Sequence, residues 1–125
     1  MAKYILHTAD SRGYADHGWL KSHHTFSFAG YFNPDRVNFG ALRVLNDDYV
    51  AAVGFGAHPH GNMEIISIPV EGKLAHKDST RSEGVIEKGE IQFMSAGTGV
   101  THSEMNGSST EAVKFLQIWL FPNKQ

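Results

Sequence analysis

Residues 41–72, ALRVLNDDYVAAVGFGAHPHGNMEIISIPVEG, alternate short runs of β-forming residues with turn-forming residues. Ala41–Leu45 and Tyr49–Phe55 are predicted strands, and Asn46–Asp48 is the predicted turn between them. Glu64–Val70 is a third predicted strand, which ends at Glu71-Gly72. Short strands about ten residues apart, separated by turns, indicate an all-β sandwich or barrel.

The same pattern continues on both sides of this stretch. Thr25–Phe28 and Glu90–Met94 alternate polar and apolar residues, and Val113–Phe121 is the longest apolar run. Pro69 lacks an amide hydrogen, so we expect it at a sheet edge or a bulge. No window has helical periodicity between caps. We therefore expect one all-β domain that spans residues 1–125.

Composition excludes several classes of function. The chain has 11 basic and 13 acidic residues and a formal charge of −2, and its basic residues are scattered. It therefore lacks the broad cationic surface that binds nucleic acid or anionic lipid. No apolar run is long enough for a membrane span, and Met1–His7 is too short for a signal peptide, so we expect a cytoplasmic protein. There is no cysteine, so a transition-metal site must use histidine and carboxylate ligands.

Two short segments carry residues that can bind a metal. His58 and His60 flank Pro59, and His102 and Glu104 follow a glycine-rich approach. Residues two apart on a strand lie on one face, so each pair can direct both side chains at one point. Two such pairs on neighbouring strands would supply three imidazoles and one carboxylate. This set suits one divalent transition metal, Fe(II), Mn, Ni, Co, Cu or Zn.

The remaining polar residues have less specific interpretations. Glu64 would share the face of His60 if the strand continued without a shift, or it could be a surface residue or a partner of a ligand imidazole. Asp47 and Asp48 are assigned to a turn rather than a catalytic pair. Five histidines are expected to be surface or hydrogen-bonded residues, with His24 the nearest of them to a site. These are His7, His17, His23, His24 and His76.

The two segments resemble the cupin signature, in which H-x-H-x3-E and a following glycine match His58, His60, Glu64 and Gly72. The second cupin motif matches more loosely, at Gly89, Gly97 and His102. Further stretches resemble the pirin family, and bacterial pirin-like quercetin 2,3-dioxygenases in particular. These are HGWL (17–20), HTFSF (24–28), LRVLNDD (42–48), GFGAHPH (54–60) and SAGTGVTHSE (95–104).

The resemblance implies a single cupin barrel, that is, a double-stranded β-helix or jelly roll. It implies that the metal ligands are His58, His60, His102 and Glu104, and that Glu64 contacts a ligand or takes part in catalysis. The metal would typically be iron(II). Some family members cleave the flavonol quercetin with dioxygen and release carbon monoxide, and Glu104 or Glu64 could then take the flavonol proton.

Family members usually have two barrels, and this chain has the length of one. We therefore expect an exposed apolar face that a second copy covers in a homodimer. The alternative function is a non-catalytic, metal-binding regulatory or redox-sensing module that acts through a protein partner. A cupin isomerase or sugar-binding protein, which would need Arg, Lys or Tyr inside the barrel, and a degenerate structural half-domain are further alternatives.

Overall fold

The computed structural model describes residues 5–51, 55–60, 63–78, 83–95, 100–108 and 110–122, and for residues 55–60, 78, 83 and 100–103 it describes the backbone alone. Over these residues the chain is almost entirely β, with one short 3-10 helix, η1 (Ala9–Ser11). The all-β prediction is confirmed. The strands are β1 (Gly13–Asp16), β2 (Leu20–His24), β3 (Leu42–Val50), β4 (Phe55–His60), β5 (Glu64–Glu71), β6 (Lys73–Asp78), β7 (Glu83–Glu87), β8 (Gln92–Ser95), β9 (Val100–Asn106) and β10 (Val113–Leu120).

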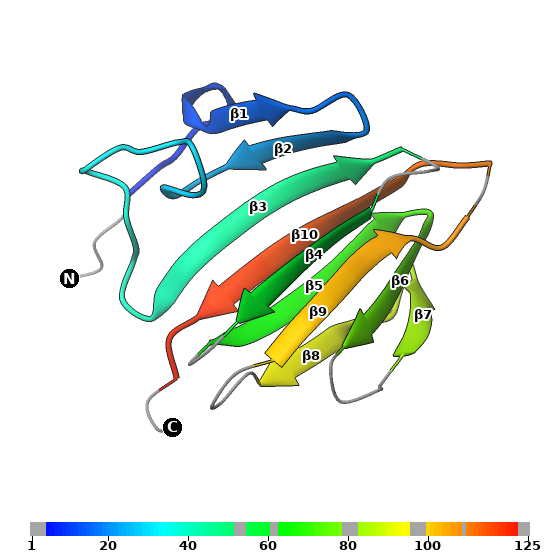
Figure 1. Cartoon of the computed structure of the whole chain (residues 1–125). Helices are drawn as coiled ribbons and strands as arrows, with labels where there is room; N and C mark the ends of the chain where they lie inside the picture. Colours follow the sequence, from blue (N-terminus) through cyan, green and yellow to red (C-terminus); the bar gives the residue numbers. More distant parts are fainter. Residues whose placement is uncertain are drawn as a thin grey trace.

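The strands form two antiparallel sheets that face each other (Figure 1). The larger sheet has the order β1-β2-β3-β10-β5-β8, and the smaller has the order β4-β9-β6-β7. Strands that neighbour each other in a sheet are often distant in sequence, such as β3 and β10, as in a jelly roll. In the part of the chain that the structure describes, no helix is long and apolar enough to cross a bilayer.

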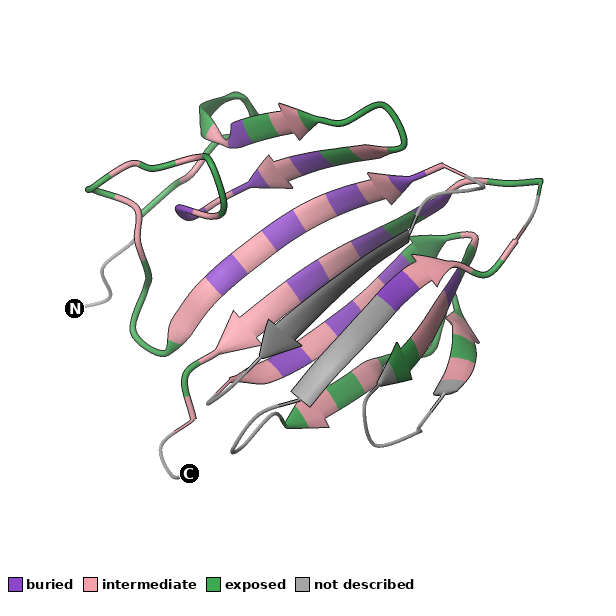
Figure 2. Cartoon of the chain, viewed as in Figure 1, coloured by how far each residue is buried: buried purple, intermediate pink, exposed green. Residues whose placement is uncertain are grey.

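The core lies between the two sheets. Val50, Val113 and Phe115 of the larger sheet pack with Leu74 of the smaller one, and all four are buried. Alternate residues of β3, β5 and β10 are buried along each strand (Figure 2). This period-two burial is expected of strands with one face on a core. It fixes which positions of the larger sheet point into the barrel and which point outward.

The turn predicted at Asn46–Asp48 is wrong, because β3 runs without interruption from Leu42 to Val50. Asn46 and Asp48 alternate with outward residues and are buried, like Val44 and Val50 beside them. Asparagine and aspartate favour turns when their side chains bond to nearby backbone. Here these side chains bond instead to residues of β2, so the strand continues.

The strand predicted at Thr25–Phe28 is also wrong. The strand in this region is β2, which ends at His24, and Phe28 forms only an isolated bridge to Tyr31. The Ser27 hydroxyl donates to the carbonyls of Asn33 and Arg36, which holds the segment in a compact loop. Tertiary hydrogen bonds outweigh the short alternating pattern there.

The prediction for Pro69 is confirmed. Along the β10–β5 ladder Lys114 pairs with Glu71 and Phe115 pairs with Pro69, so Val70 is passed over in a register irregularity. A bulge tolerates a residue that has no amide hydrogen. The predicted strands at Glu64–Val70 and Val113–Phe121 correspond to β5 and β10.

Candidate metal centre

The backbone of β4 and β9 brings the two predicted ligand segments together. In this antiparallel pair His58 lies opposite His102, and Gly56 lies opposite Glu104. Opposed residues, and residues two apart, belong to the same face of a sheet. Positions 58, 60, 102 and 104 therefore share one face. The side chains of His58, His60 and His102 lie outside the described residues, so the ligand set stays a prediction; among the described side chains alone there is no group of three metal-binding residues.

The side chain of Glu104 shows that this face points into the barrel. Its Oε1 accepts a hydrogen bond from Ser67 Oγ at 3.1 Å, and its Oε2 accepts one from Gln117 Nε2 at 2.6 Å. Ser67 and Gln117 lie on β5 and β10 of the opposite sheet. Glu104 therefore connects the two sheets across the interior.

Burial is the largest influence on Glu104, which is 8 % exposed. It raises the pKa of this carboxyl to about 7, and the negative charge of Asp48 adds to the rise, while the hydrogen bonds from Ser67 and Gln117 oppose it. A divalent cation at positions 58, 60 and 102 would favour the carboxylate form and offset the effect of burial. The chemistry of these residues thus fits a metal such as iron or nickel.

Glu64 lies on the other face of its strand. It is half-buried and pairs with Ser95 and Leu120, whereas Ser67, three residues later, points inward to Glu104. No register shift occurs between Glu64 and Ser67 in either ladder. Of the two carboxylates predicted to act in catalysis, Glu104 has the position that suits the role.

His76 was expected to be a surface or hydrogen-bonded residue, and the structure places it beside Glu104. It lies directly opposite Glu104 in the β6–β9 ladder and is half-buried. Its Nδ1 atom is buried and has no hydrogen-bond partner among the residues that the structure describes. The imidazole is therefore a near neighbour of the predicted ligand positions.

A cavity of about 660 Å³ adjoins Glu104. Its size is within the range of sites for small organic ligands. Apolar and aromatic side chains form most of the wall, including Trp19, Leu20, Phe28 and Phe115. The polar groups that line it are few and come from both sheets. They include Ser22, His24, Asp48, Glu104 and Gln117.

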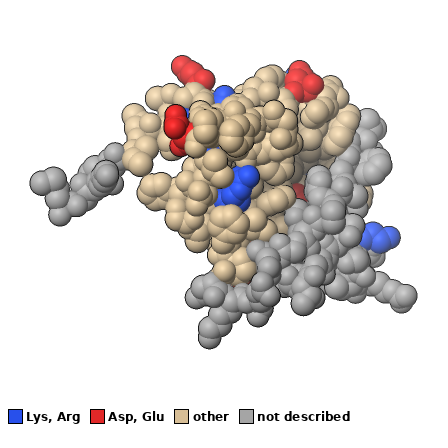
Figure 3. Space-filling view, turned by 60° about the vertical axis from the view of Figure 1, so that its left-hand side comes forward, with Lys and Arg blue, Asp and Glu red and all other residues tan. Residues whose placement is uncertain are grey.

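The cavity is not built for an anion. No Lys or Arg occurs among the described residues that line it. Of the residue types that the sugar-binding alternative would need inside, Tyr14 and Tyr31 line the cavity. Arg43 donates to the carbonyls of Ser27 and Val37, and Arg12 pairs with Asp47 at 3.1 Å. Among the residues coloured in Figure 3, charged groups occur singly between uncharged ones. The lack of cationic side chains disfavours an anionic ligand, and the aromatic side chains offer contact surface for flat, apolar rings.

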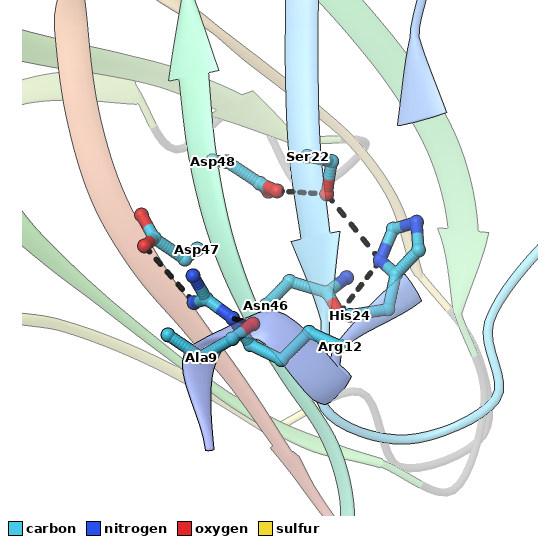
Figure 4. A network of polar contacts seen from close by, with 7 residues as sticks. All are labelled: Ala9, Arg12, Ser22, His24, Asn46, Asp47 and Asp48. Carbon is cyan, nitrogen blue, oxygen red and sulfur yellow. Dashed lines mark hydrogen bonds and ion pairs between the residues drawn. The ribbon is translucent and has the colours of Figure 1, made fainter. Parts of the chain in front are cut away.

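One wall of the cavity carries a polar network that sequence reasoning missed (Figure 4). His24 Nδ1 lies 3.0 Å from Asn46 Oδ1 and 3.4 Å from Ser22 Oγ, and Ser22 Oγ donates to Asp48 Oδ1. Burial raises the pKa of Asp48 to about 6. The alternation of Val44, Asn46, Asp48 and Val50 in the sequence was the signal that could have revealed it.

Known proteins support the assignment of the fold and the family. The family model described as Pirin matches residues 6–120. A quercetin 2,3-dioxygenase of Escherichia coli (strain K12) is 52% identical over 120 residues, which are 95% of this chain and 52% of that protein. A putative quercetin 2,3-dioxygenase of Zymomonas mobilis is 54% identical over 113 residues, 90% of this chain and 48% of that protein.

Solved structures agree. The crystal structure of YhhW from Escherichia coli superposes with a TM-score of 0.91 at 51% identity, over 94% of this chain and 51% of that one. The bacterial pirin YhhW from Escherichia coli in complex with nickel(II) superposes with a TM-score of 0.89, at the same identity and coverage. The predicted cupin-type barrel is thus confirmed. The chain spans about half the length of these relatives, and over that span it belongs to the pirin family.

Proposed function

We propose that this chain is a metal-dependent dioxygenase that cleaves a flavonol such as quercetin with dioxygen. The observation that carries the proposal is the cavity, which is lined mostly by apolar and aromatic side chains and has Glu104 and the face of positions 58, 60 and 102 at its side. Relatives named quercetin 2,3-dioxygenase, about half identical over this span, support the substrate class.

The proposed metal ligands are His58, His60, His102 and Glu104. A nickel complex of a related pirin supports a divalent metal, and we propose iron(II) as the metal in this chain. A bound divalent metal would act as a Lewis acid toward the flavonol 3-hydroxyl and lower its pKa. Ser67 and Gln117 would hold the Glu104 carboxylate in a fixed orientation.

The chain's own residues would bind the ligand and take its proton. Trp19, Phe28 and Phe115 provide apolar surface for flat rings and keep bulk water from them. A bound divalent cation would keep Glu104 in the carboxylate form, which is the form that can accept the flavonol proton. We assign the proton transfer to Glu104 rather than Glu64, because Glu64 points away from the cavity side of β5.

Oxygen uptake tests the proposal. Protein loaded anaerobically with iron(II) should consume dioxygen when a flavonol is added, and Glu104→Gln should reduce the rate at least a hundredfold. Glu71→Gln, which changes an exposed carboxylate at the end of β5 in the other sheet, should keep the wild-type rate. Absence of uptake by fully loaded wild-type protein would contradict the enzyme and favour the regulatory module.

We also propose that a second copy covers the outer face of the larger sheet. The register directs Ile66, Ile68, Leu116 and Ile118 outward in neighbouring positions, and Phe93 beside Ile66 is 58% exposed. A contiguous apolar surface of this kind usually marks an interface. Light scattering at micromolar concentration should give the mass of a dimer, and Phe93→Glu should give a monomer. A monomeric wild-type chain would contradict this proposal.

A further inference from the structure

The inner face of the larger sheet carries one continuous polar row. Five residues from five strands line up by direct pairing: His24 with Asn46, Asn46 with Gln117, Gln117 with Ser67, and Ser67 with Gln92. The next row along the strands is apolar, namely Val44, Trp119, Ile65 and Met94. A polar row inside a small barrel is costly unless its groups are bonded or used. Gln117 and Ser67 of this row donate hydrogen bonds to Glu104. His24 and Asn46 of the row form a second cluster with Ser22 and Asp48, which pair in the adjacent row, and this β2–β3 part needs a separate explanation.

In the cluster of His24, Asn46, Ser22 and Asp48, the groups that can only accept hydrogen bonds show where the protons lie. Asn46 Oδ1 can only accept, so the proton of His24 lies on Nδ1 and points to it. Ser22 Oγ gives its own proton to Asp48 Oδ1, and it lies 3.4 Å from His24 Nδ1, whose proton already points to Asn46. The donated protons of this cluster are therefore those of His24 Nδ1 and Ser22 Oγ. This arrangement leaves His24 Nε2 and the second oxygen of Asp48 as acceptors without donors among the described residues.

The imidazole stays neutral in this position. Burial lowers the pKa of His24, and the hydrogen bond to Asn46 opposes this effect only in part. Phe28 and Tyr31 lie against its ring, at centroid distances of 5.1 and 6.2 Å. The ring is thus held by aromatic neighbours, with its unprotonated nitrogen available to a ligand in the cavity.

We infer that this wall is a subsite for hydroxyl groups on a ligand's aromatic ring, with His24 Nε2 and the Asp48 carboxylate as the two acceptors. Ser22 Oγ lies between the two residues, 3.4 Å from His24 Nδ1 and bonded to Asp48 Oδ1, and His24 and Asp48 both line the cavity, so the two acceptors belong to one wall. The inference rests on the proposed function for the ligand class and adds to it the pattern of hydroxyls. A ring that carries hydroxyl groups would bind here, while the flavonol's other end approaches Glu104.

Equilibrium binding to metal-free protein without oxygen tests the subsite. Three flavonols that differ in their pendant ring, with two, one or no hydroxyls, are titrated by calorimetry into the wild type and three variants. Each hydroxyl lost should weaken wild-type binding roughly three- to tenfold, the value of one hydrogen bond. In His24→Phe and in Asp48→Asn, each of which removes one of the two acceptors, the effect of one hydroxyl should be lost, while binding of the flavonol without these hydroxyls stays the same. His23→Phe, on the outward face of β2, should discriminate as the wild type does.

Two results would overturn the inference: equal wild-type affinity for all three flavonols, or full discrimination in both inner-wall variants. Asp48→Asn preserves shape, so it gives an answer even if His24→Phe does not fold, as thermal unfolding would show. The proposed function is judged separately by oxygen uptake. If the protein distinguishes the three flavonols but consumes no oxygen, the subsite is supported and the proposed enzyme is contradicted. If it consumes oxygen but binds the three flavonols equally, the enzyme is supported and the subsite is contradicted.

Discussion

The buried carboxyl of Glu104 predicts how the stability of the metal-free protein depends on pH. Its pKa is raised from 4.5 to about 7 in the folded protein. One pKa unit corresponds to about 1.4 kcal/mol, so the shift is equivalent to roughly 3 kcal/mol. Since the folded state holds the proton more tightly, its contribution to stability is full below pH 4.5 and is lost as pH rises through about 7.

Glu104→Gln isolates this contribution because glutamine does not titrate. We expect the free energy of unfolding of the wild type, relative to this variant, to fall by about 2–3 kcal/mol between about pH 5 and pH 8. Urea denaturation with a chelator present, followed by circular dichroism, measures it. The exposed Glu71→Gln should keep a constant difference from the wild type across this range. A wild-type advantage over Glu104→Gln that is constant, or that grows with pH, would refute the reasoning.

Other predictions concern backbone, core and metal. Gly72 has a φ of +79°, and an added Cβ would lie 2.4 Å from the Ala112 carbonyl oxygen, so Gly72→Ala should lower the free energy of unfolding, measured with urea, by at least about 2 kcal/mol. Gly89 has a φ of +97° but lies in open space, so Gly89→Ala should lower it by only about 1 kcal/mol. Leu74→Ala removes a fully buried side chain and should lower the free energy of unfolding by about 2–5 kcal/mol in the same assay. Added divalent metal should raise the melting temperature more near pH 8 than near pH 5, since the ligands must be deprotonated. An equal rise at both would contradict the predicted set of three histidines and one carboxylate.

Strand periodicity was enough to predict much of the fold. The predominantly apolar segment Val113–Phe121 could only be a strand, and it forms β10. Pro69 lacks an amide hydrogen and was expected at an edge or a bulge, and it lies at the irregularity in the β10–β5 ladder. Asn46–Asp48 had two interpretations, because the same residues favour a turn locally and a strand when they have distant partners. Ser22 and His24 are those partners, 26 and 22 residues away along the chain.

The candidate site was predictable to a similar degree. Period-two spacing placed His58 with His60 and His102 with Glu104, and the β4–β9 register puts these four positions on one face. The position of Glu64 depended on an unknown shift after His60, and the register of β5 assigns it to the outer face. The hydroxyl-binding wall depends on how β2, β3 and β10 align, which no local pattern in the sequence specifies.

The central claim is that His58, His60, His102 and Glu104 hold one metal ion. The most direct test is elemental analysis of protein purified without an affinity tag, on the wild type, His58→Ala, Glu104→Ala and the outward-facing control His23→Ala. The wild type and the control should carry about one transition-metal ion per chain, and the two site variants should lose most of it. An unchanged metal content in both His58→Ala and Glu104→Ala would contradict the claim.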